Sequence, residues 1–520
     1  MEVFKGLKLS ASKNEAGWHN SIQKSFLFVP TAGMRVSSDD LIIELYREVF
    51  FENRSEGGLK RIDPEEQENG NSVFDDEEKF SLYMSRGRKK QTSATRQLTN
   101  FYTPLYPGLA RRSWLRKQSE RAVRDFFLKA IAQHLHGCGN YSQSAGNDLI
   151  DVFYSALRGK CNGTERGEDI AGLQIDTLRG CVSAEDGKDK LTDLCGLSGE
   201  DKKSGKSIFI LQMKGSDDLA RTLFEDLYQL CQLEGSLDRL QWMSLLKTFL
   251  RFSSSVWLLA QMKMTIVLRD KLLSILTGSS DLDIDEKWVD EIIQTRHHGL
   301  FKPTMTPTNQ LEKYVQQYVK ARIELNILVA LVEKYSDSDW SDKTMALHTG
   351  SQSDLGILEL MTKALNMKNS LSAGLDGADL RVVLTRFCER FSAWSMPVKA
   401  TSGPAKGYCE YLLVLRKMEK GDEDGGYLVI PSKRKNTGYK IFPGNLMLKL
   451  VTFLAERANP NKKLVFADVE NHFKKYGLDF GEKGEIRPKL IESLQDMGLL
   501  KGSPDAGDSV AVSNPYPLKI

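Results

Sequence analysis

The sequence has no uninterrupted apolar run of the length that a membrane-spanning helix requires. The nearest candidate, residues 256–276, carries four charged residues between positions 263 and 271, whereas a spanning helix needs about 20 predominantly apolar residues. This segment is therefore interpreted as a helix buried within a bundle. Residues 1–10 carry two lysines and lack the apolar core of a signal peptide. We expect a cytoplasmic protein with no membrane partner.

Cysteine is also scarce, with seven residues scattered along 520 positions and no CxxC pair. This usage is typical of free thiols in a reducing compartment. His134, His136 and Cys138 were weighed as zinc ligands, but their alternate spacing suits a helix poorly and no fourth ligand lies nearby. Like His297 and His298, they are interpreted as side chains near the C-terminal carbonyls of a helix. No metal and no cofactor is expected.

Catalytic signatures are absent as well, so a non-catalytic role is the leading expectation. The composition is that of an ordinary soluble protein, with 41% hydrophobic and 27% charged residues. The net charge of +3 is too small to argue for or against a polyanionic partner. A metal-dependent nuclease, with a site assembled from carboxylates far apart in the sequence, remains an alternative.

Apolar residues at helical spacing dominate what is present, and they predict a mainly α fold: a multidomain helical bundle with minor β structure. Helices are expected over residues 39–51, 111–136, 147–157, 217–233, 237–251, 256–276, 286–294, 309–335, 354–365 and 376–394. Short strands are expected over residues 25–30, 207–213, 411–416 and 427–430.

The helix expected over residues 309–335 carries an apolar seam with a repeat of about seven residues. Its members are Leu311, Tyr314, Tyr318, Ala321, Leu325, Leu328, Val332 and Tyr335. Such a seam predicts packing along a partner helix. A partner within the same chain is favoured over an intermolecular coiled coil, because the repeat covers only about four heptads.

Shifts in composition divide the chain into six parts. These are an N-terminal segment with an acidic linker (1–72), a basic helical region (73–160), a polar insertion (161–215), a central helical domain (216–395), a linker with short strands (396–440) and a C-terminal domain (441–520).

The C-terminal part contains three helical patterns followed by two short strands. Helices are expected over residues 445–457, 466–476 and 484–497, with Pro488 in the first turn of the third, and strands over 500–503 and 509–512. This order resembles the winged helix-turn-helix superfamily, whose members mostly bind DNA and sometimes proteins. The resemblance implies a winged-helix domain over 441–520 and identifies no family for the remainder.

The third helix of this domain has an unusual outer face for a DNA reader. In DNA-binding members this helix enters the major groove with basic or amide side chains. Here the corresponding face carries Glu485, Lys489, Glu492, Gln495 and Asp496. Three carboxylates against one lysine would meet phosphate repulsion. The sequence therefore predicts non-specific backbone contact or protein docking, and no specific reading of bases.

The strongest charge feature is segment 86–129, which has twelve Lys and Arg residues against two acids. Aromatic residues are interleaved with the charges, including Tyr102 and Trp114. A basic surface with aromatic platforms suits a phosphate backbone, and open strands would add stacking. The alternative is pairing with segment 52–79, which has ten acids and four bases, or with a partner protein.

Candidate nucleic-acid-binding residues come from this segment, from a basic run at 433–435 and from the winged-helix domain. They are Arg86, Arg88, Lys89, Lys90, Arg112, Arg116, Lys117, Arg121, Arg124, Lys433, Arg434, Lys435, Lys474, Lys475, Arg487 and Lys489.

The sequence as a whole favours a non-catalytic DNA-binding subunit of a larger complex, with non-specific DNA and other protein subunits as partners. Its architecture, a large helical chain with a terminal winged helix and no motor motif, is similar to accessory subunits of prokaryotic DNA-surveillance or anti-phage defence systems, by analogy alone. A protein–protein scaffold that docks through the winged helix is the first alternative.

Overall fold

The computed structural model describes a mostly helical protein. The residues that it describes are 41–42, 45, 123, 127–128, 131, 149–157, 218–277, 286–335, 357–370, 429–431, 439–481, 486–501 and 510–516. The mainly α prediction is confirmed over these ranges. The six-part division of the chain, the strands predicted at 25–30, 207–213 and 411–416, and the helix at 376–394 lie wholly or partly outside them.

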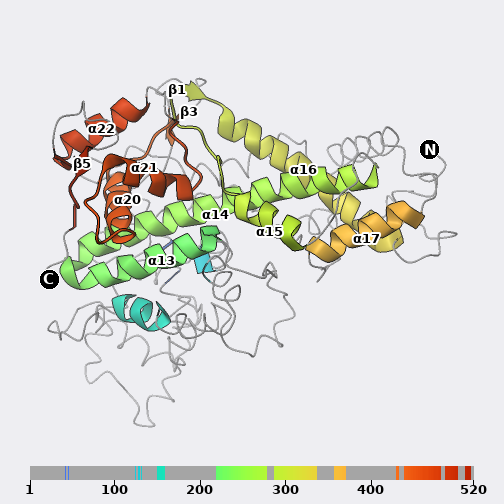
Figure 1. Ribbon diagram of the computed structural model, residues 1–520, viewed down its shortest axis with the longest axis horizontal. Coiled ribbons are helices and arrows are strands. Elements are labelled where there is room, and N and C mark those ends of the chain that lie inside the picture. Colours follow the sequence, from blue (N-terminus) through green and yellow to red (C-terminus); the bar gives the residue numbers. More distant parts are fainter. Residues whose placement is uncertain are drawn as a thin grey trace, which may run out of the picture.

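A helical hairpin forms the centre of the molecule. Helix α13 (Asp218–Leu233) leads through the 3-10 turn η4 (Glu234–Ser236) into the long helix α14 (Arg239–Leu276). Asp238 caps α14, because its carboxylate accepts a hydrogen bond from the Gln241 amide at 2.9 Å. Figure 1 shows α14 running lengthwise through the middle of the molecule, between α13 below it and the C-terminal helices above it. Of the helices described, none is both long and apolar enough to cross a bilayer.

Helix α14 corrects one prediction, because two helices were expected at 237–251 and 256–276 and the structure has a single one. The serines at the expected break continue the helix. Ser253 donates to the Leu250 carbonyl at 3.2 Å and Ser255 to the Arg251 carbonyl at 2.7 Å. Their hydroxyls are therefore satisfied inside the helix, at sites where they are fully buried. The sequence pattern missed this because the serines resemble a polar loop.

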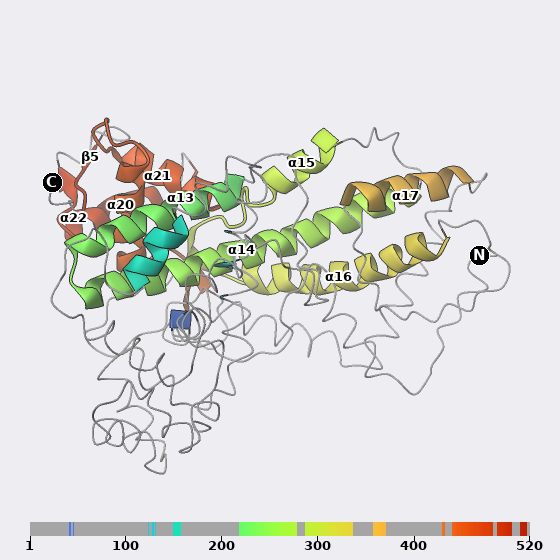
Figure 2. The ribbon, with the colours of Figure 1, turned by 90° about the horizontal axis from the view of Figure 1, so that it is seen from below.

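Helices α15 (Glu286–Thr295), α16 (Gln310–Tyr335) and α17 (Ile357–Ser370) complete the helical body. Tyr314 donates to the Leu259 carbonyl at 3.0 Å, and Arg269 donates to Glu324 at 2.6 Å. Both pairs are 55 residues apart in the sequence, so α14 and α16 run in the same direction. α17 packs against both helices (Figure 2).

The predicted seam of α16 is used inside the chain. The seam residues whose side chains are described are buried against the core, apart from Tyr314, which is partly buried: Leu311, Tyr318, Ala321, Leu325, Leu328 and Val332. Since α16 makes its most extensive contact with α14, the interpretation as an internal bundle helix is supported.

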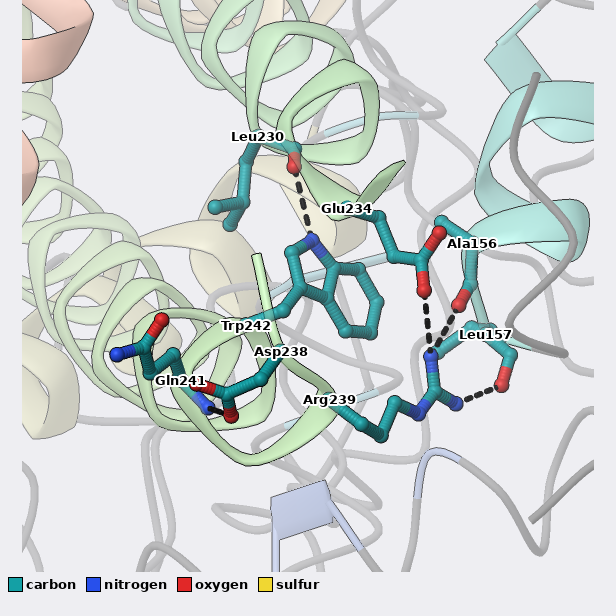
Figure 3. A network of polar contacts seen from close by, with 8 residues as sticks. All are labelled: Ala156, Leu157, Leu230, Glu234, Asp238, Arg239, Gln241 and Trp242. Carbon is teal, nitrogen blue, oxygen red and sulfur yellow. Dashed lines mark hydrogen bonds and ion pairs between the residues drawn. The ribbon is translucent and has the colours of Figure 1, made fainter. Parts of the chain in front are cut away.

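The hairpin also holds the end of the helical stretch 149–157. Figure 3 shows Arg239, which donates to the Ala156 carbonyl at 2.6 Å and to the Leu157 carbonyl, and stacks 5.1 Å over the Trp242 ring. Glu234 lies 3.5 Å from the same guanidinium. A partly buried guanidinium thus satisfies carbonyls at the C-terminal end of a helix, which lack partners within the helix.

The C-terminal end of the predicted basic segment is anchored to this core through aromatic rings. Phe127 is 1% exposed, and its ring lies 6.2 Å from that of Phe153 and 6.1 Å from that of Phe249. Val123 and Ile131 are buried with it. Apolar side chains near the end of the basic segment therefore belong to the main core.

A small antiparallel sheet connects the helical body to the C-terminal part. Its order is β1 (Thr304–Thr308), β3 (Tyr439–Ile441), β2 (Val429–Pro431), with Thr304 opposite Ile441 and Val429 opposite the same residue. β2 overlaps the strand predicted at 427–430. Because β1 lies between α15 and α16, the sheet ties the start of the C-terminal part to the body.

Residues 439–516, hereafter the C-terminal unit, contain helices α20 (Asn445–Arg457), α21 (Phe466–Lys475) and α22 (Ile486–Asp496) and strands β4 (Leu500–Lys501) and β5 (Ala511–Val512). The helix bounds agree with the prediction within two residues, and Pro488 lies in the first turn of α22. Local chemistry explains this agreement: the Asp468 carboxylate accepts the Val465 amide at 3.0 Å at the start of α21.

A third short extended segment joins the β4–β5 hairpin. Val465 bridges Ala511, the Phe466 amide donates to the Val510 carbonyl at 2.9 Å, and the Val512 amide donates to the Leu464 carbonyl at 3.0 Å. Apolar faces of all three helices close over the hairpin, with Phe453, Phe473 and Leu494 fully buried. α20 also packs on α13 and α14, so the unit shares the main core.

Candidate functional site

The predicted nucleic-acid-binding residues fall into two groups. Lys474, Lys475, Arg487 and Lys489 belong to the described part of the chain. Outside the described residues lie Arg86, Arg88, Lys89, Lys90, Arg112, Arg116, Lys117, Arg121, Arg124, Lys433, Arg434 and Lys435.

The two basic residues of α22 are engaged in ion pairs. Arg487 makes a bidentate contact with Glu470, at 2.9 and 2.8 Å, and lies 5.4 Å from the Phe466 ring centre. Lys489 donates to Glu492 at 2.9 Å, and this hydrogen bond raises the pKa of Lys489. Their positive charges are therefore balanced by carboxylates of the same unit.

The outer face of α22 is acidic in balance. Glu492, Gln495 and Asp496 are exposed beside Lys489, which leaves one lysine for two carboxylates. The buried face is apolar, with Ile486, Leu490 and Leu494 each at most 4% exposed. A helix with this surface repels the phosphates that line the major groove. It suits a partner surface that offers positive charge or hydrogen-bond donors.

Helix α21 is joined to helix α13 by a buried pair of polar side chains. His472 Nε2 lies 2.9 Å from Asp226 Oδ2, and the two residues are only 2% and 4% exposed. Arg457, the last residue of α20, donates a hydrogen bond of 3.0 Å to Gln229, which is also on α13. Because neither His472 nor Asp226 reaches solvent, the pair joins the two elements and is not placed to act as a general base.

The backbone after α21 adds further contacts between α21 and the helical body. The region formed by Asp226, His472, Gly477 and the turn at 297–299 is hereafter called the joint. The Phe301 amide donates to the Gly477 carbonyl at 3.3 Å, and Phe301 bridges Leu478. Gly477 has a φ of +77°, and a Cβ built there would lie 2.0 Å from the His297 carbonyl oxygen. Only glycine accommodates both the left-handed backbone and this close approach. The ring of Tyr476 packs 4.8 Å from that of Phe252.

An open pocket of about 480 Å³ lies beside the joint, between α13, the turn at 297–299 and the end of α21. Lys474 and Lys475 are exposed on its wall. Neither lysine takes part in an ion pair or side-chain hydrogen bond within the described part of the chain. Of the four described candidates, these two are therefore available to an external anion.

His297 and His298 follow the C-terminal end of α15, as predicted, but the side chain that contacts the carbonyls there is a lysine. Lys263 takes that place, since its Nζ donates to the His298 carbonyl at 2.6 Å and lies 3.5 Å from the Thr295 carbonyl. Burial lowers the pKa of Lys263. His297 is 3% exposed, and burial, followed by His298, Arg296 and Lys263, lowers its pKa to about 3. His297 is therefore neutral near pH 7.

Sequence reasoning missed the residues that matter most at this joint. The sequence indicates no partner for His472, because Asp226 stands 246 positions away. His297 and Gly477 also meet only through the tertiary fold. Over the ranges that the structure describes, no three His, Cys, Asp or Glu side chains gather as metal ligands.

Comparison with known proteins adds no relative. No family model matches the chain, no curated protein matches it, and no solved structure matches it. Any functional conclusion therefore depends on the chemistry of the residues themselves.

Proposed function

We propose that this chain is a non-catalytic, nucleic-acid-associated subunit of a larger complex, and that its C-terminal unit is a winged helix. The order of α20, α21, α22 and the β4–β5 hairpin supports the second part. So does the pairing of Val465 with Ala511, which adds a short strand before the second helix. The resemblance stated from the sequence has the same order.

The charge of segment 86–129 is the observation that carries the nucleic-acid role. Twelve Lys and Arg residues against two acids form a density that suits phosphate backbones. Phe127, Val123 and Ile131 fasten the end of that segment to the core. Lys474 and Lys475 add two exposed charges. Since α22 has an acidic outer face, the mode proposed is non-specific backbone contact.

The test is equilibrium binding to a short DNA duplex across a series of salt concentrations. The logarithm of the association constant should fall linearly with the logarithm of salt concentration. The Arg121→Glu/Arg124→Glu variant should lose most affinity and reduce the salt slope by about 2. Lys302→Glu/Lys313→Glu, at two exposed lysines elsewhere, is the matched control.

Affinity that is independent of salt would contradict the mechanism, and so would equal losses in the two charge-reversed variants. Far-UV circular dichroism of each variant checks that the helices are retained. Metal-dependent cleavage of the duplex by the purified chain would replace the non-catalytic proposal with the nuclease alternative.

A second candidate function, protein docking, is favoured by the outer face of α22. Glu492, Gln495 and Asp496 are exposed on α22, whose opposite face is buried in the unit. In this case the winged helix binds a basic surface of another subunit. The two candidates separate cleanly, because reversal of Arg121 and Arg124 should abolish DNA binding and leave a protein partner bound.

The biological setting proposed is a prokaryotic DNA-surveillance or anti-phage defence system, on the analogy of architecture alone. An ATPase or nuclease encoded beside the gene for this chain, and co-purifying with it, would support this setting. Neighbours of unrelated metabolic function would oppose it.

A further inference from the structure

The pocket beside the joint has the features of an anion site. It has a volume of about 480 Å³ and lies where α13, the turn at 297–299 and the end of α21 meet. A lone phosphate ion needs far less room, whereas ligand pockets typically span about 300–1,000 Å³. The cavity is thus large enough for a phosphate group together with the organic group that carries it.

His297 lies at the buried side of this pocket. It lines the cavity, is 3% exposed, and its Nδ1 is buried without a hydrogen-bond partner in the described part of the chain. Such an unsatisfied group costs free energy unless a ligand or water meets it. The neighbouring charges that depress its pKa are His298, Arg296 and Lys263, so the electrostatic environment of His297 is positive.

The wall of the pocket carries two exposed lysines. Lys474 and Lys475 are exposed and take part in no ion pair among the described residues. Arg221 lies on the facing helix, where it binds Asp218 at 2.8 Å. Lysine side chains bind a phosphate as point charges and do not require the fixed bidentate geometry of arginine.

The carboxylates of the pocket differ in their availability. Asp218 is bound to Arg221, and Asp479 accepts the Gly481 amide at 3.1 Å. Glu225 is exposed on α13 and has no partner among the described residues. Its charge opposes an anion, so removing that charge should strengthen anion binding. A cation or a zwitterion would respond in the opposite direction.

We propose that this pocket binds a terminal phosphate, a phosphomonoester carried by a nucleotide or by the end of a nucleic-acid strand, with Lys474 and Lys475 holding its oxygens. Arg221 and His298 complete the polar wall, and the body of the ligand fills the remaining volume. The pocket shares Lys474 and Lys475 with the proposed DNA-binding surface but includes no residue of segment 86–129, so binding at the pocket can be measured separately from binding by that segment.

Isothermal titration calorimetry of the full chain tests the site with five ligands. These are inorganic phosphate, AMP, adenosine, and one oligonucleotide in two forms, with and without a 5′-phosphate. AMP should bind and adenosine should not. Lys474→Ala/Lys475→Ala should weaken AMP binding by about tenfold or more, as expected for charge-assisted hydrogen bonds. Lys463→Ala, an exposed lysine of the same unit outside the pocket, should leave it unchanged. Glu225→Gln should strengthen it.

The two sources of the phosphate separate in the same experiment. Preference for the phosphorylated oligonucleotide over AMP identifies a strand end, and the reverse identifies a free nucleotide. Adenosine binding as tightly as AMP overturns the proposal, as does AMP binding that the lysine pair does not affect. AMP binding by a chain that fails to bind duplex DNA would support this site and contradict the proposed function.

Discussion

Helices α21 and α22 are adjacent in the sequence and similar in length, yet they have opposite relations to the rest of the molecule. On α21 the side chain of His472 points into the protein and meets Asp226, and Gly477 follows against the His297 carbonyl, while Lys474 and Lys475 stay exposed at its end. On α22, Glu492 and Asp496 are exposed. Helix α21 therefore joins the C-terminal unit to the helical body, whereas α22 exposes its polar face to solvent.

This contrast teaches how a unit of three helices and a two-stranded hairpin can be used within a larger protein. The unit is joined to the helical body through its second helix by a buried hydrogen-bonded pair, a backbone bridge and aromatic packing. Its third helix is then held in place for a partner. The following predictions test the two sides of this difference, from the largest expected effect to the smallest.

Gly477→Ala should have the largest effect on the joint. The added Cβ meets the His297 carbonyl oxygen at 2.0 Å and the φ of +77° disfavours any side chain. We expect the free energy of unfolding to fall by about 4 kcal/mol or more, measured by urea denaturation. Gly498→Ala, at a φ of +69° with open space around the Cβ, is the matched control and should cost only about 1 kcal/mol. Equal losses would show that the close approach is unimportant.

Asp226→Ala should come next. It leaves the His472 ring buried without its hydrogen-bond partner, and an unsatisfied buried polar group costs about 1–3 kcal/mol of stability. The double variant Asp226→Leu/His472→Leu should recover much of this loss, because an apolar pair has no unsatisfied group. Thermal unfolding of both variants provides the measurement. A single variant as stable as the parent would mean that the pair does not hold α21 to α13.

His297 predicts a pH dependence with a definite sign. Its pKa is about 3 in the folded chain and 6.5 in the unfolded one, so the unfolded chain binds the additional proton between these values. Stability is therefore full above pH 6.5 and falls as pH is lowered towards 3, by up to about 1.4 kcal/mol per pH unit. His297→Gln should flatten this slope. His298→Gln, at the exposed neighbour, should not, and identical slopes in all three proteins would refute the assignment.

Charge reversal on α22 should have the smallest effect on stability. Glu492→Lys/Asp496→Lys removes one exposed ion pair, between Lys489 and Glu492, so the free energy of unfolding should change by less than about 1 kcal/mol. DNA affinity should rise at low salt, and binding of a basic protein partner should be lost. Asp270→Lys/Glu291→Lys, on the helical body, is the control with equal charge change. An unaltered affinity for both kinds of partner would remove α22 from consideration as an interface.

The C-terminal unit was predictable from sequence to a degree that the helical body was not. Its helix bounds follow from short-range signals, such as Asp468 at the start of α21 and Pro488 in the first turn of α22. In the body, the serines at 253–255 resembled a break, and only burial among neighbouring helices made them part of α14. The seam of α16 was predicted because a sustained apolar repeat is itself a local pattern.

The candidate site was predictable only in part. Lys474, Lys475, Arg487 and Lys489 were selected as basic residues, and the sequence could not separate the available pair from the engaged pair. Glu492 lies three residues from Lys489 on the same helix, but Glu470 meets Arg487 only when α21 and α22 pack together.

What the sequence by itself determined is the helical character of the chain, the apolar faces of its helices and the charge density of segment 86–129, because these depend on neighbours along the chain. The tertiary structure decided which charges are neutralised, that His472 meets Asp226, and that Gly477 leaves room for the His297 carbonyl. These depend on residues far apart in sequence, which only packing of the core brings within a few ångströms.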